Sequence, residues 1–555
     1  MAFVITRPCC NDASCVSVCP VNCIHPTPEE PEFRTAEMLY IDPESCIDCG
    51  ACVDACPVGA IFPDGELADE DEPYLRLNAD YYLDHDGEAG EAPLRRAPKL
   101  PDGDVYIAVV GAGPAAFYAA EELVRFGSVQ VDMYDRLPTP YGLVRAGVAP
   151  DHAATKAVER TFASTERKKN FQYRLDVTVG RDITLDELAD RYHAVLHASG
   201  ASTDKKLGIA GEDLPGSVAA TEFVAWYNGH PDHADDVYDL SSERAVIVGN
   251  GNVALDVARI LLTDPDELAS TDIAQHALEA LRTSSIREVV ILGRRSIADG
   301  AYTNSEFLST GLVDGVDVVI DDADLTVSPQ IAAQLDDGTV DSTIGSKVRL
   351  AREYAANGTH SADRRVVFRY LTAPTEVLGD SAVTGVRIVR NSYDAQGRVC
   401  PTGETSEIST GLVIRSIGYR GQVVDGLPFD EETGTVPNHA GRVVNTEGEH
   451  LPGQYVAGWL KRGASGGIGT NRFCGQETAS VIVEDIVGGA MPTPPLHRDD
   501  VVAMLASRGV LPIDGGGWSN IDKAERTASR AVGSVRRKIV TIAKLREAAT
   551  GPIPG

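Results

Sequence analysis

The chain has 555 residues, of which 43% are hydrophobic and 24% are charged, and its formal net charge is −32 at pH 7. This length suffices for about three or four domains. The acidic balance argues against nucleic acid as a main partner, because phosphate binding needs a basic surface. No run of about 18 apolar residues and no signal peptide is recognised, so we expect no membrane span and, given the clustered thiols, a reducing cytoplasm.

Nine of the 11 cysteines precede residue 57. The second run has the spacing C-x2-C-x2-C-x3-C-P of bacterial iron–sulfur ferredoxins, in which the fourth cysteine binds the other cluster. We therefore expect Cys46, Cys49 and Cys52 to hold three corners of a [4Fe–4S] cluster. Cys19 from the first run supplies the fourth corner, and Cys56 crosses over to the first run's cluster.

The first run lacks the C-x2-C-x2-C pattern. Cys9, Cys15 and Cys56 give three ligands, which suits a [3Fe–4S] cluster, but Cys10 can replace Cys9 or join it to hold a second [4Fe–4S] cluster. Zinc is the alternative metal, since C-x2-C pairs also build zinc ribbons. The Cys-Pro in each run favours iron–sulfur.

After the cysteines, residues 63–104 are rich in acidic residues and proline and are predicted to be an extended linker. An apolar strand is then expected at 105–110, followed at once by a glycine-rich loop and a helix, the context that supports a dinucleotide site. A second strand ends at Asp135, where an acid should bond a ribose hydroxyl, so FAD and NAD both fit. The loop residues are Gly111, Gly113, Ala115 and Ala116.

The same order of strand, loop and helix recurs about 138 residues later. Its partner strand ends in Arg294 and Arg295 rather than in an acid, and paired guanidiniums favour a 2′-phosphate, hence NADPH. Nicotinamide gives two electrons and an iron–sulfur cluster accepts one, so a flavin belongs between them. The second loop comprises Gly251, Asn252, Val253 and Ala254.

Three longer segments carry a family resemblance: PTPYGLVRAGVAPDH at 138–152, GNGNVALDVAR at 249–259 and GWLKRGASGGIGTN at 458–471. They resemble the adrenodoxin-reductase-like ferredoxin–NADP reductases over residues 104–490. The whole chain resembles the mycobacterial-type reductases fused to an N-terminal ferredoxin. FVITRPC and CVSVCPVNC are similar to seven-iron bacterial ferredoxins, which implies Cys9, Cys15 and Cys56 as ligands of the three-iron cluster.

The resemblance also implies site residues. Trp459, Glu306 and His152 would lie at the catalytic centre, with Trp459 against the flavin and the other two positioning nicotinamide or shuttling protons. Lys205 stands where the relatives usually have Arg. FAD would contact the first loop, Asp135, Leu143, Trp459, Gly466, Gly467 and Ile468; NADP would contact the second loop, Arg294, Arg295, Glu306 and Gly466.

The expected fold is an α+β bacterial ferredoxin domain followed by two α/β dinucleotide-binding, Rossmann-like domains. Its function would be that of a ferredoxin–NADP(+) reductase serving a redox protein such as a haem monooxygenase or a separate ferredoxin. A glutamate-synthase-type electron-input subunit and a non-catalytic redox carrier or sensor are the alternatives. The predicted domains are a ferredoxin at 1–62, an FAD domain at 105–205 and 425–490, an NADP domain at 206–424, and a C-terminal extension at 491–555 read as a docking helix or tail.

Overall fold

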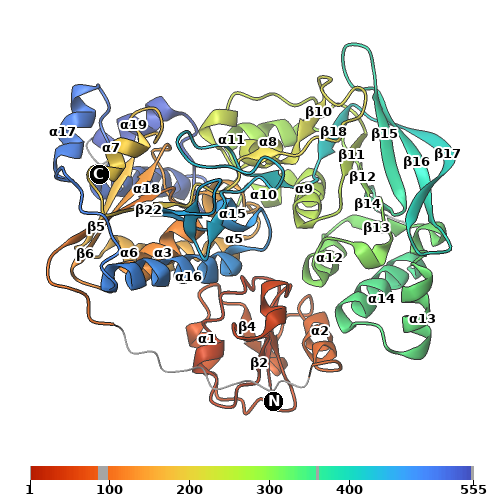
Figure 1. Ribbon diagram of the computed structural model, residues 1–555. Coiled ribbons are helices and arrows are strands. Elements are labelled where there is room, and N and C mark those ends of the chain that lie inside the picture. The colour runs from red at the N-terminus through yellow and green to blue at the C-terminus, as the bar shows by residue number, and fades with distance from the viewer. Residues whose placement is uncertain (1, 86–97, 358–361, 552–555) are drawn as a thin grey trace.

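The computed structural model describes residues 2–85, 98–357 and 362–551, and has three parts (Figure 1). A small cysteine-rich unit, residues 2–85, lies below two larger parts. We call these the first α/β domain, built on the strands of 105–197 and 438–456, and the second α/β domain, built on the strands of 217–415. This arrangement confirms the expected fold class.

The cysteine-rich unit contains two short antiparallel strand pairs, β1 with β4 and β2 with β3. Its apolar residues, including Phe3, Ile24 and Phe33, are buried together. The elements are β1 (Phe3–Ile5), β2 (Ile24–His25), β3 (Tyr40–Ile41), α1 (Ala51–Ala55), β4 (Ile61–Pro63) and α2 (Pro73–Tyr81).

Helix α2 corrects the prediction of an extended linker over 63–104. Its Tyr74, Leu77, Asn78 and Tyr81 are buried, so one face of the helix packs on the unit. Asn78 accepts hydrogen bonds from the backbone N–H groups of Ile5 and Ile41 at Oδ1, and donates to the Ile5 carbonyl. The helix is thus part of the cysteine-rich unit, and residues 86–97 of the predicted linker lie outside the described residues.

The first α/β domain has a seven-stranded sheet in the order β20-β21-β22-β8-β5-β6-β7. The apolar run at 105–110 forms the central strand β5, which pairs in parallel with β6 and β8. The elements are β5 (Val105–Val110), α3 (Pro114–Leu123), β6 (Val129–Asp135), α4 (Leu143–Ala146), α5 (Ala153–Lys156), α6 (Glu159–Glu166), β7 (Phe171–Leu175), α7 (Leu185–Ala189), β8 (Ala194–His197), β20 (Asn438–His439), β21 (Arg442–Val444), β22 (His450–Val456), α15 (Trp459–Arg462) and α16 (Ile468–Val487).

The second α/β domain has a parallel six-stranded sheet in the order β10-β18-β11-β12-β14-β13, with an antiparallel three-stranded sheet, β15-β16-β17, beside it. A ribbon of β9 (Thr203–Asp204) and β19 (Tyr419–Arg420) lies where the chain crosses between the α/β domains. The elements are β10 (Ser217–Ala219), α8 (Ala220–Tyr227), β11 (Arg244–Val248), α9 (Asn252–Leu262), α10 (Pro265–Leu268), α11 (Gln275–Arg282), β12 (Glu288–Leu292), α12 (Asn304–Thr310), β13 (Val316–Ile320), α13 (Pro329–Asp337), α14 (Ser342–Ala356), β14 (Arg364–Arg369), β15 (Thr372–Leu378), β16 (Gly385–Tyr393), β17 (Val399–Ser409) and β18 (Leu412–Arg415).

The C-terminal residues pack on the α/β domains. Arg145 of α4 forms a bidentate ion pair with the buried Glu525, which also pairs with Arg536. The segment is therefore anchored by buried charge pairs. Its helices are α17 (Asp500–Ser507), α18 (Gly515–Arg530) and α19 (Ile542–Thr550). Among the described residues, none of the helices combines the length and apolarity needed to cross a bilayer.

Candidate nucleotide and iron–sulfur sites

The first glycine-rich loop joins β5 to α3. Gly111 has φ +106°, and a Cβ there would lie 2.5 Å from the carbonyl oxygen of Ala198, so only glycine fits. Gly113 precedes the first residue of α3 and provides no side-chain cap, and a Cβ there would have no neighbour within 4 Å among the described residues. The helix N-terminus thus presents free backbone N–H groups beside open space, which fits a pyrophosphate.

Other predicted residues of this site converge on the start of α3. Asp135, at the end of β6, accepts hydrogen bonds from the N–H groups of Ala112 and Leu137, both at 2.9 Å. Burial raises the pKa of its carboxyl group, although these bonds oppose the shift. Leu143 begins α4 directly after Gly142, where a Cβ would lie 3.0 Å from the Cα atom of Gly113. Ala115 and Ala116 are buried in the first turn of α3.

Helix α16 contributes a second open helix N-terminus. Gly466 has φ +71°, and Gly467 precedes the first helical residue, Ile468, without a side-chain cap or a neighbour for an added Cβ. Trp459, at the start of α15, donates from Nε1 to the Ser465 carbonyl, and its ring lies 5.2 Å from that of Tyr419.

The second loop repeats the construction of the first. Gly249 has φ +108°, and a Cβ there would lie 2.1 Å from the Ser416 carbonyl oxygen. Gly251 precedes the first residue of α9, provides no side-chain cap, and has no described atom within 4 Å of the position of an added Cβ. Asn252 accepts a hydrogen bond from the N–H of Thr303 at 2.8 Å, which links the loop to α12. Val253 and Ala254 complete the first turn of α9.

The two arginines predicted to bind a 2′-phosphate follow β12 and are exposed. Arg295 pairs with Asp299 at 3.1 Å, whereas Arg294 forms no ion pair within the described part of the chain. Lys205 lies elsewhere, exposed in the crossover, where its N–H donates to the Gly418 carbonyl. The structure gives it no contact with either arginine.

His152 and Glu306 come together in a charged cluster between the α/β domains. Arg7, from the cysteine-rich unit, donates to Glu306 at 3.1 Å and also contacts the His152 ring. Arg259 donates to His152 at 2.6 Å and to Asp256 at 2.8 Å. His152, Asp256 and Glu306 present ligand atoms within 4.8 Å of one another, and the two guanidiniums supply the positive charge among them.

Burial and neighbouring charge set the protonation of this cluster. Burial, followed by the charge of Arg259, lowers the pKa of His152, so the imidazole is neutral near pH 7. Burial disfavours the ionised form of Glu306, but surrounding positive charges, Arg7 and Arg259 among them, hold its pKa below the usual range. Burial, with a smaller effect from Asp256, raises the pKa of Tyr419, the neighbour of Trp459, to about 12, so its phenol stays protonated near pH 7.

Sequence reasoning missed Arg7, Asp256 and Arg259. The last two lie three residues apart in the segment GNVALDVAR, and this spacing was the available signal, because such residues share a helix face. Arg7 carried no signal, because its role arises from domain packing. Among the described residues, Nε of Arg7 and Nη1 of Arg259 are buried and find no hydrogen-bond acceptor, which fits a polar ligand group at this place.

The predicted ligands of the second cluster lie together. Cys19, Cys46, Cys49 and Cys52 line one recess, together with Cys23. Burial and then the nearby Cys46, Cys19 and Cys49 thiols raise the pKa of Cys52 to about 11. The Sγ atoms of Cys19 and Cys23 are 3.5 Å apart. Four thiols around one recess fit an iron–sulfur cube.

The predicted ligands of the first cluster also lie together. Burial is the main cause that raises the pKa of Cys9, Cys10 and Cys15, and Cys56 contributes to each shift. Cys10 is buried within the hydrophobic core of the first α/β domain, and Cys9 and Cys56 border that core. This thiol set therefore lies next to the first α/β domain.

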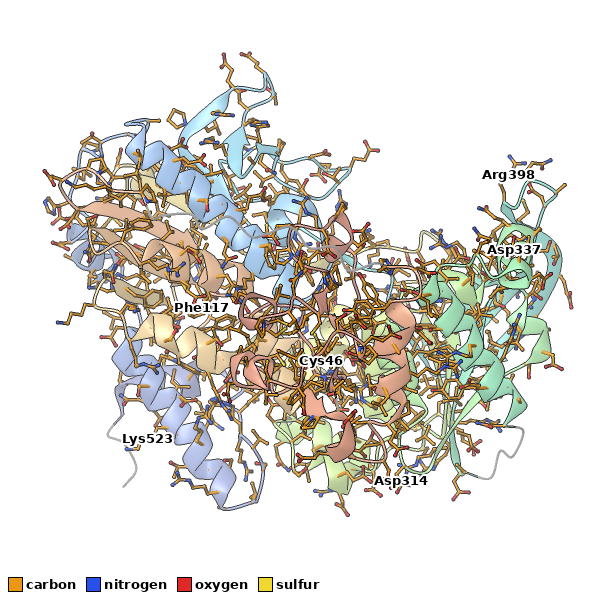
Figure 2. The ribbon with its side chains drawn as sticks, turned by 90° about the horizontal axis from the view of Figure 1, so that it is seen from below. Cys46, Phe117, Asp314, Asp337, Arg398 and Lys523 are labelled. Carbon is orange, nitrogen blue, oxygen red and sulfur yellow. The ribbon has the colours of Figure 1, made fainter. Side chains whose placement is uncertain are left out.

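The cysteine-rich unit contacts both larger domains. Figure 2, seen from below, labels Cys46 of this unit between Phe117 of the first α/β domain and Asp337 of the second. On one side Asp12 pairs with Arg472 of α16 at 2.9 Å. On the other, Asp80 of α2 pairs with Arg349 of α14 at 2.8 Å.

Comparisons with known proteins agree with this architecture. Residues 105–299 match the model of the pyridine nucleotide-disulphide oxidoreductases, and residues 39–62 match that of the 4Fe-4S binding domain. A "Probable ferredoxin/ferredoxin–NADP reductase" of Mycobacterium tuberculosis is 46% identical, with 99% of this chain and 95% of the relative covered. The counterpart from Mycobacterium leprae is 44% identical over 100% of this chain and 99% of its own.

A solved structure covers the two α/β domains. "Mycobacterium tuberculosis FprA in complex with NADPH" is 43% identical and has a TM-score of 0.75, with 81% of this chain and 100% of that chain covered. Identity at this level over the full length shows kinship rather than a shared fold alone. The chain belongs to the family of ferredoxin/ferredoxin–NADP reductases.

Proposed function

We propose that the protein is an FAD-dependent ferredoxin–NADP reductase that exchanges electrons between NADPH and iron–sulfur clusters in its own cysteine-rich unit. The observation that carries this proposal is the seating of that unit on both α/β domains. The N–H of Gly469, in the first turn of α16, donates to the Cys10 carbonyl at 2.8 Å. The backbone of Cys10, which belongs to the first thiol set, therefore contacts the first turn of the helix that is proposed to hold flavin.

Bound NADPH would supply a hydride, and bound FAD would provide the conversion from an electron pair to single electrons that iron–sulfur clusters need. The protein's task is mainly orientation. The open N-termini of α3 and α16 would hold FAD, with Asp135, Leu143 and Trp459 around it. The second loop, Arg294 and Arg295 would hold NADP.

The charged cluster is the proposed nicotinamide-positioning site. Ionised Glu306 offers an acceptor, the unsatisfied N–H groups of Arg7 and Arg259 offer donors, and neutral His152 fixes both guanidiniums through its Nε2 atom. These groups suit the carboxamide of a nicotinamide, which both donates and accepts hydrogen bonds. Lys205, exposed at the crossover, remains a proposed secondary phosphate contact.

For the clusters, we propose [4Fe–4S] on Cys19, Cys46, Cys49 and Cys52, and [3Fe–4S] on Cys9, Cys15 and Cys56. The burial of Cys10 in the core of the first α/β domain supports Cys9 as the ligand. The acceptor beyond the clusters would be a redox protein such as a haem monooxygenase or a separate ferredoxin. No specific observation favours a glutamate-synthase-type subunit or a non-catalytic carrier.

The test is anaerobic purification followed by iron, sulfide and flavin assays, EPR, and NADPH-driven reduction of ferricyanide and cytochrome c. We expect a yellow-brown protein with about seven irons per chain and an EPR signal from the oxidised three-iron cluster. About eight irons without that signal would replace the three-iron assignment with a second cubane. A preparation with zinc, no flavin and no NADPH oxidation would overturn the proposal.

A further inference from the structure

The first thiol set is enclosed by the contact between the cysteine-rich unit and α16. Beyond the bond from Gly469 to Cys10, Arg472 donates to the Ser14 hydroxyl at 2.6 Å and pairs with Asp12. Phe473 packs edge-on against Phe33, with ring centroids 4.5 Å apart. Cys10 and Cys15 are buried, and Cys9 and Cys56 are only partly exposed, so this contact covers much of the first thiol set.

The second thiol set lies at the surface instead. Cys49 is exposed, and Ile47, two residues before it, exposes 58% of its surface. Val21, 39% exposed, lines the same recess as the thiols. Two apolar side chains thus stand in water at the mouth of the recess that holds the proposed [4Fe–4S] cluster.

The charged residues around the second cysteine run in the sequence are all acidic. Glu44 precedes these thiols, Asp48 lies between Cys46 and Cys49, and Asp54 follows Cys52 in α1; all three are exposed. No Lys or Arg occurs from residue 35 to residue 75, and residues 1–85 contain 17 Asp and Glu but three Arg. One of these arginines, Arg7, is taken up by Glu306 in the contact with the second α/β domain.

We propose that Val21, Ile47, Glu44, Asp48 and Asp54 form an exit face, on which a protein with a basic patch around its own redox centre docks to receive electrons. This inference rests on the proposed function and adds a direction: electrons enter through the enclosed first cluster and leave through the second. Apolar contact at the centre excludes water, and the acidic rim steers a basic partner. Each NADPH oxidised yields NADP+, one proton released to solvent and two electrons, which leave singly, so two one-electron acceptors are reduced per NADPH and each gains one negative charge.

The first experiment measures binding rather than turnover. Oxidised cytochrome c, a small basic haem protein, is titrated calorimetrically into the full-length holoprotein at low and high salt. The variant Glu44→Gln/Asp48→Asn removes two charges from the exit face, and Glu404→Gln/Glu447→Gln removes two exposed charges from the α/β domains. We expect the first variant to bind about fivefold more weakly, with a shallower salt dependence, and the second to bind like the native protein.

A second variant tests the apolar centre. Ile47→Gln keeps every charge, so we expect slower NADPH-driven reduction of cytochrome c with an unchanged salt dependence. Iron content and EPR of each variant are measured first. If Asp48→Asn lowers the iron content, Glu44→Gln/Asp54→Asn replaces the double variant with the same expectation.

The outcomes separate this inference from the proposed function. A native protein that fails to reduce ferricyanide with NADPH refutes the reductase itself. A protein that reduces ferricyanide, but whose exit-face variants match the native protein and the control in affinity, salt dependence and cytochrome c reduction, overturns the exit face. Equal losses in the exit-face variant and the control also overturn it, because they show a general charge effect.

Discussion

Arg7 donates a hydrogen bond from Nη2 to Oε2 of Glu306 across 3.1 Å, although the two residues are 299 positions apart. The bond joins the cysteine-rich unit to the second α/β domain at the proposed nicotinamide site. It also helps to keep the buried Glu306 ionised. Seating of the unit and the charge state of the nicotinamide site are therefore coupled through one guanidinium.

Replacing Arg7 should slow internal electron transfer. Arg7→Gln removes a charge-assisted hydrogen bond, and such bonds contribute about 1.5–3 kcal/mol, so we expect NADPH-driven cluster reduction to fall about tenfold. Rapid mixing with anaerobic detection of cluster bleaching gives the rate. Arg7→Lys keeps the positive charge and should recover part of the lost rate. A native rate in the Gln variant would contradict the coupling.

Gly469→Ala should disrupt the contact between the cysteine-rich unit and α16. The new Cβ would lie 1.9 Å from the Asn11 carbonyl oxygen, and backbone atoms cannot yield cheaply. Alanine favours the helix by about 1 kcal/mol, so α16 itself should not weaken. We expect slower cluster reduction with ferricyanide reduction retained. Glu484→Ala, an exposed change on the same helix, is the control, and equal cluster rates in both variants would refute the close contact.

Loss of Arg294 and Arg295 should erase the preference for NADPH. The variant Arg294→Gln/Arg295→Gln removes the charges proposed to meet the 2′-phosphate, so kcat/KM for NADPH should fall about 100-fold. NADH lacks that phosphate and should change little. Arg398→Gln, at the far tip of the β16–β17 hairpin in Figure 2, is the matched control. If the ratio of kcat/KM for NADPH to kcat/KM for NADH did not change, the 2′-phosphate would bind elsewhere.

Asp272→Asn should destabilise the protein strongly. Asp272 accepts from Nζ of Lys156 at 2.7 Å and pairs with Lys538 at 2.9 Å, and all three groups are buried. Removing this carboxylate leaves Lys156 and Lys538, the latter with a pKa that burial already lowers to about 7, without a counter-charge, a loss of about 3–5 kcal/mol in the free energy of unfolding. Urea denaturation measures it. Asp213→Asn, a change at an exposed residue, should not shift the urea midpoint of unfolding. A native urea midpoint for Asp272→Asn would show that the buried charges are solvated.

His197 should make stability fall in acid. Burial lowers its pKa to about 4 from the ordinary 6.5, with a hydrogen bond to Gln454 opposing the shift. Between these values the unfolded chain binds a proton that the folded chain excludes, so stability decreases as pH falls from about 6.5 toward 4. His197→Gln should reduce that slope by up to about 1.4 kcal/mol per pH unit in urea titrations. Parallel slopes, as expected for the exposed His439→Gln, would contradict this assignment.

The local elements were predictable because their signals are local. The apolar run at 105–110 and the glycine loops predicted β5, α3 and α9, since strand burial and tight turns depend on adjacent residues. Helix α2 was missed because its acidic surroundings suggested a linker, although Tyr74, Leu77, Asn78 and Tyr81 recur at helical spacing. Arg7 could not be predicted, because domain packing alone brings it to Glu306.

Helix α2 and the Asp12 loop hold the cysteine-rich unit to opposite partners, α14 and α16. The unit therefore spans the two larger domains and is fixed to both of them. A rotation that separates the two α/β domains must break the contact with α14 or the contact with α16. Where the contact with α16 is the one that breaks, the proposed first cluster leaves the proposed flavin site, so domain separation and loss of internal electron transfer then coincide.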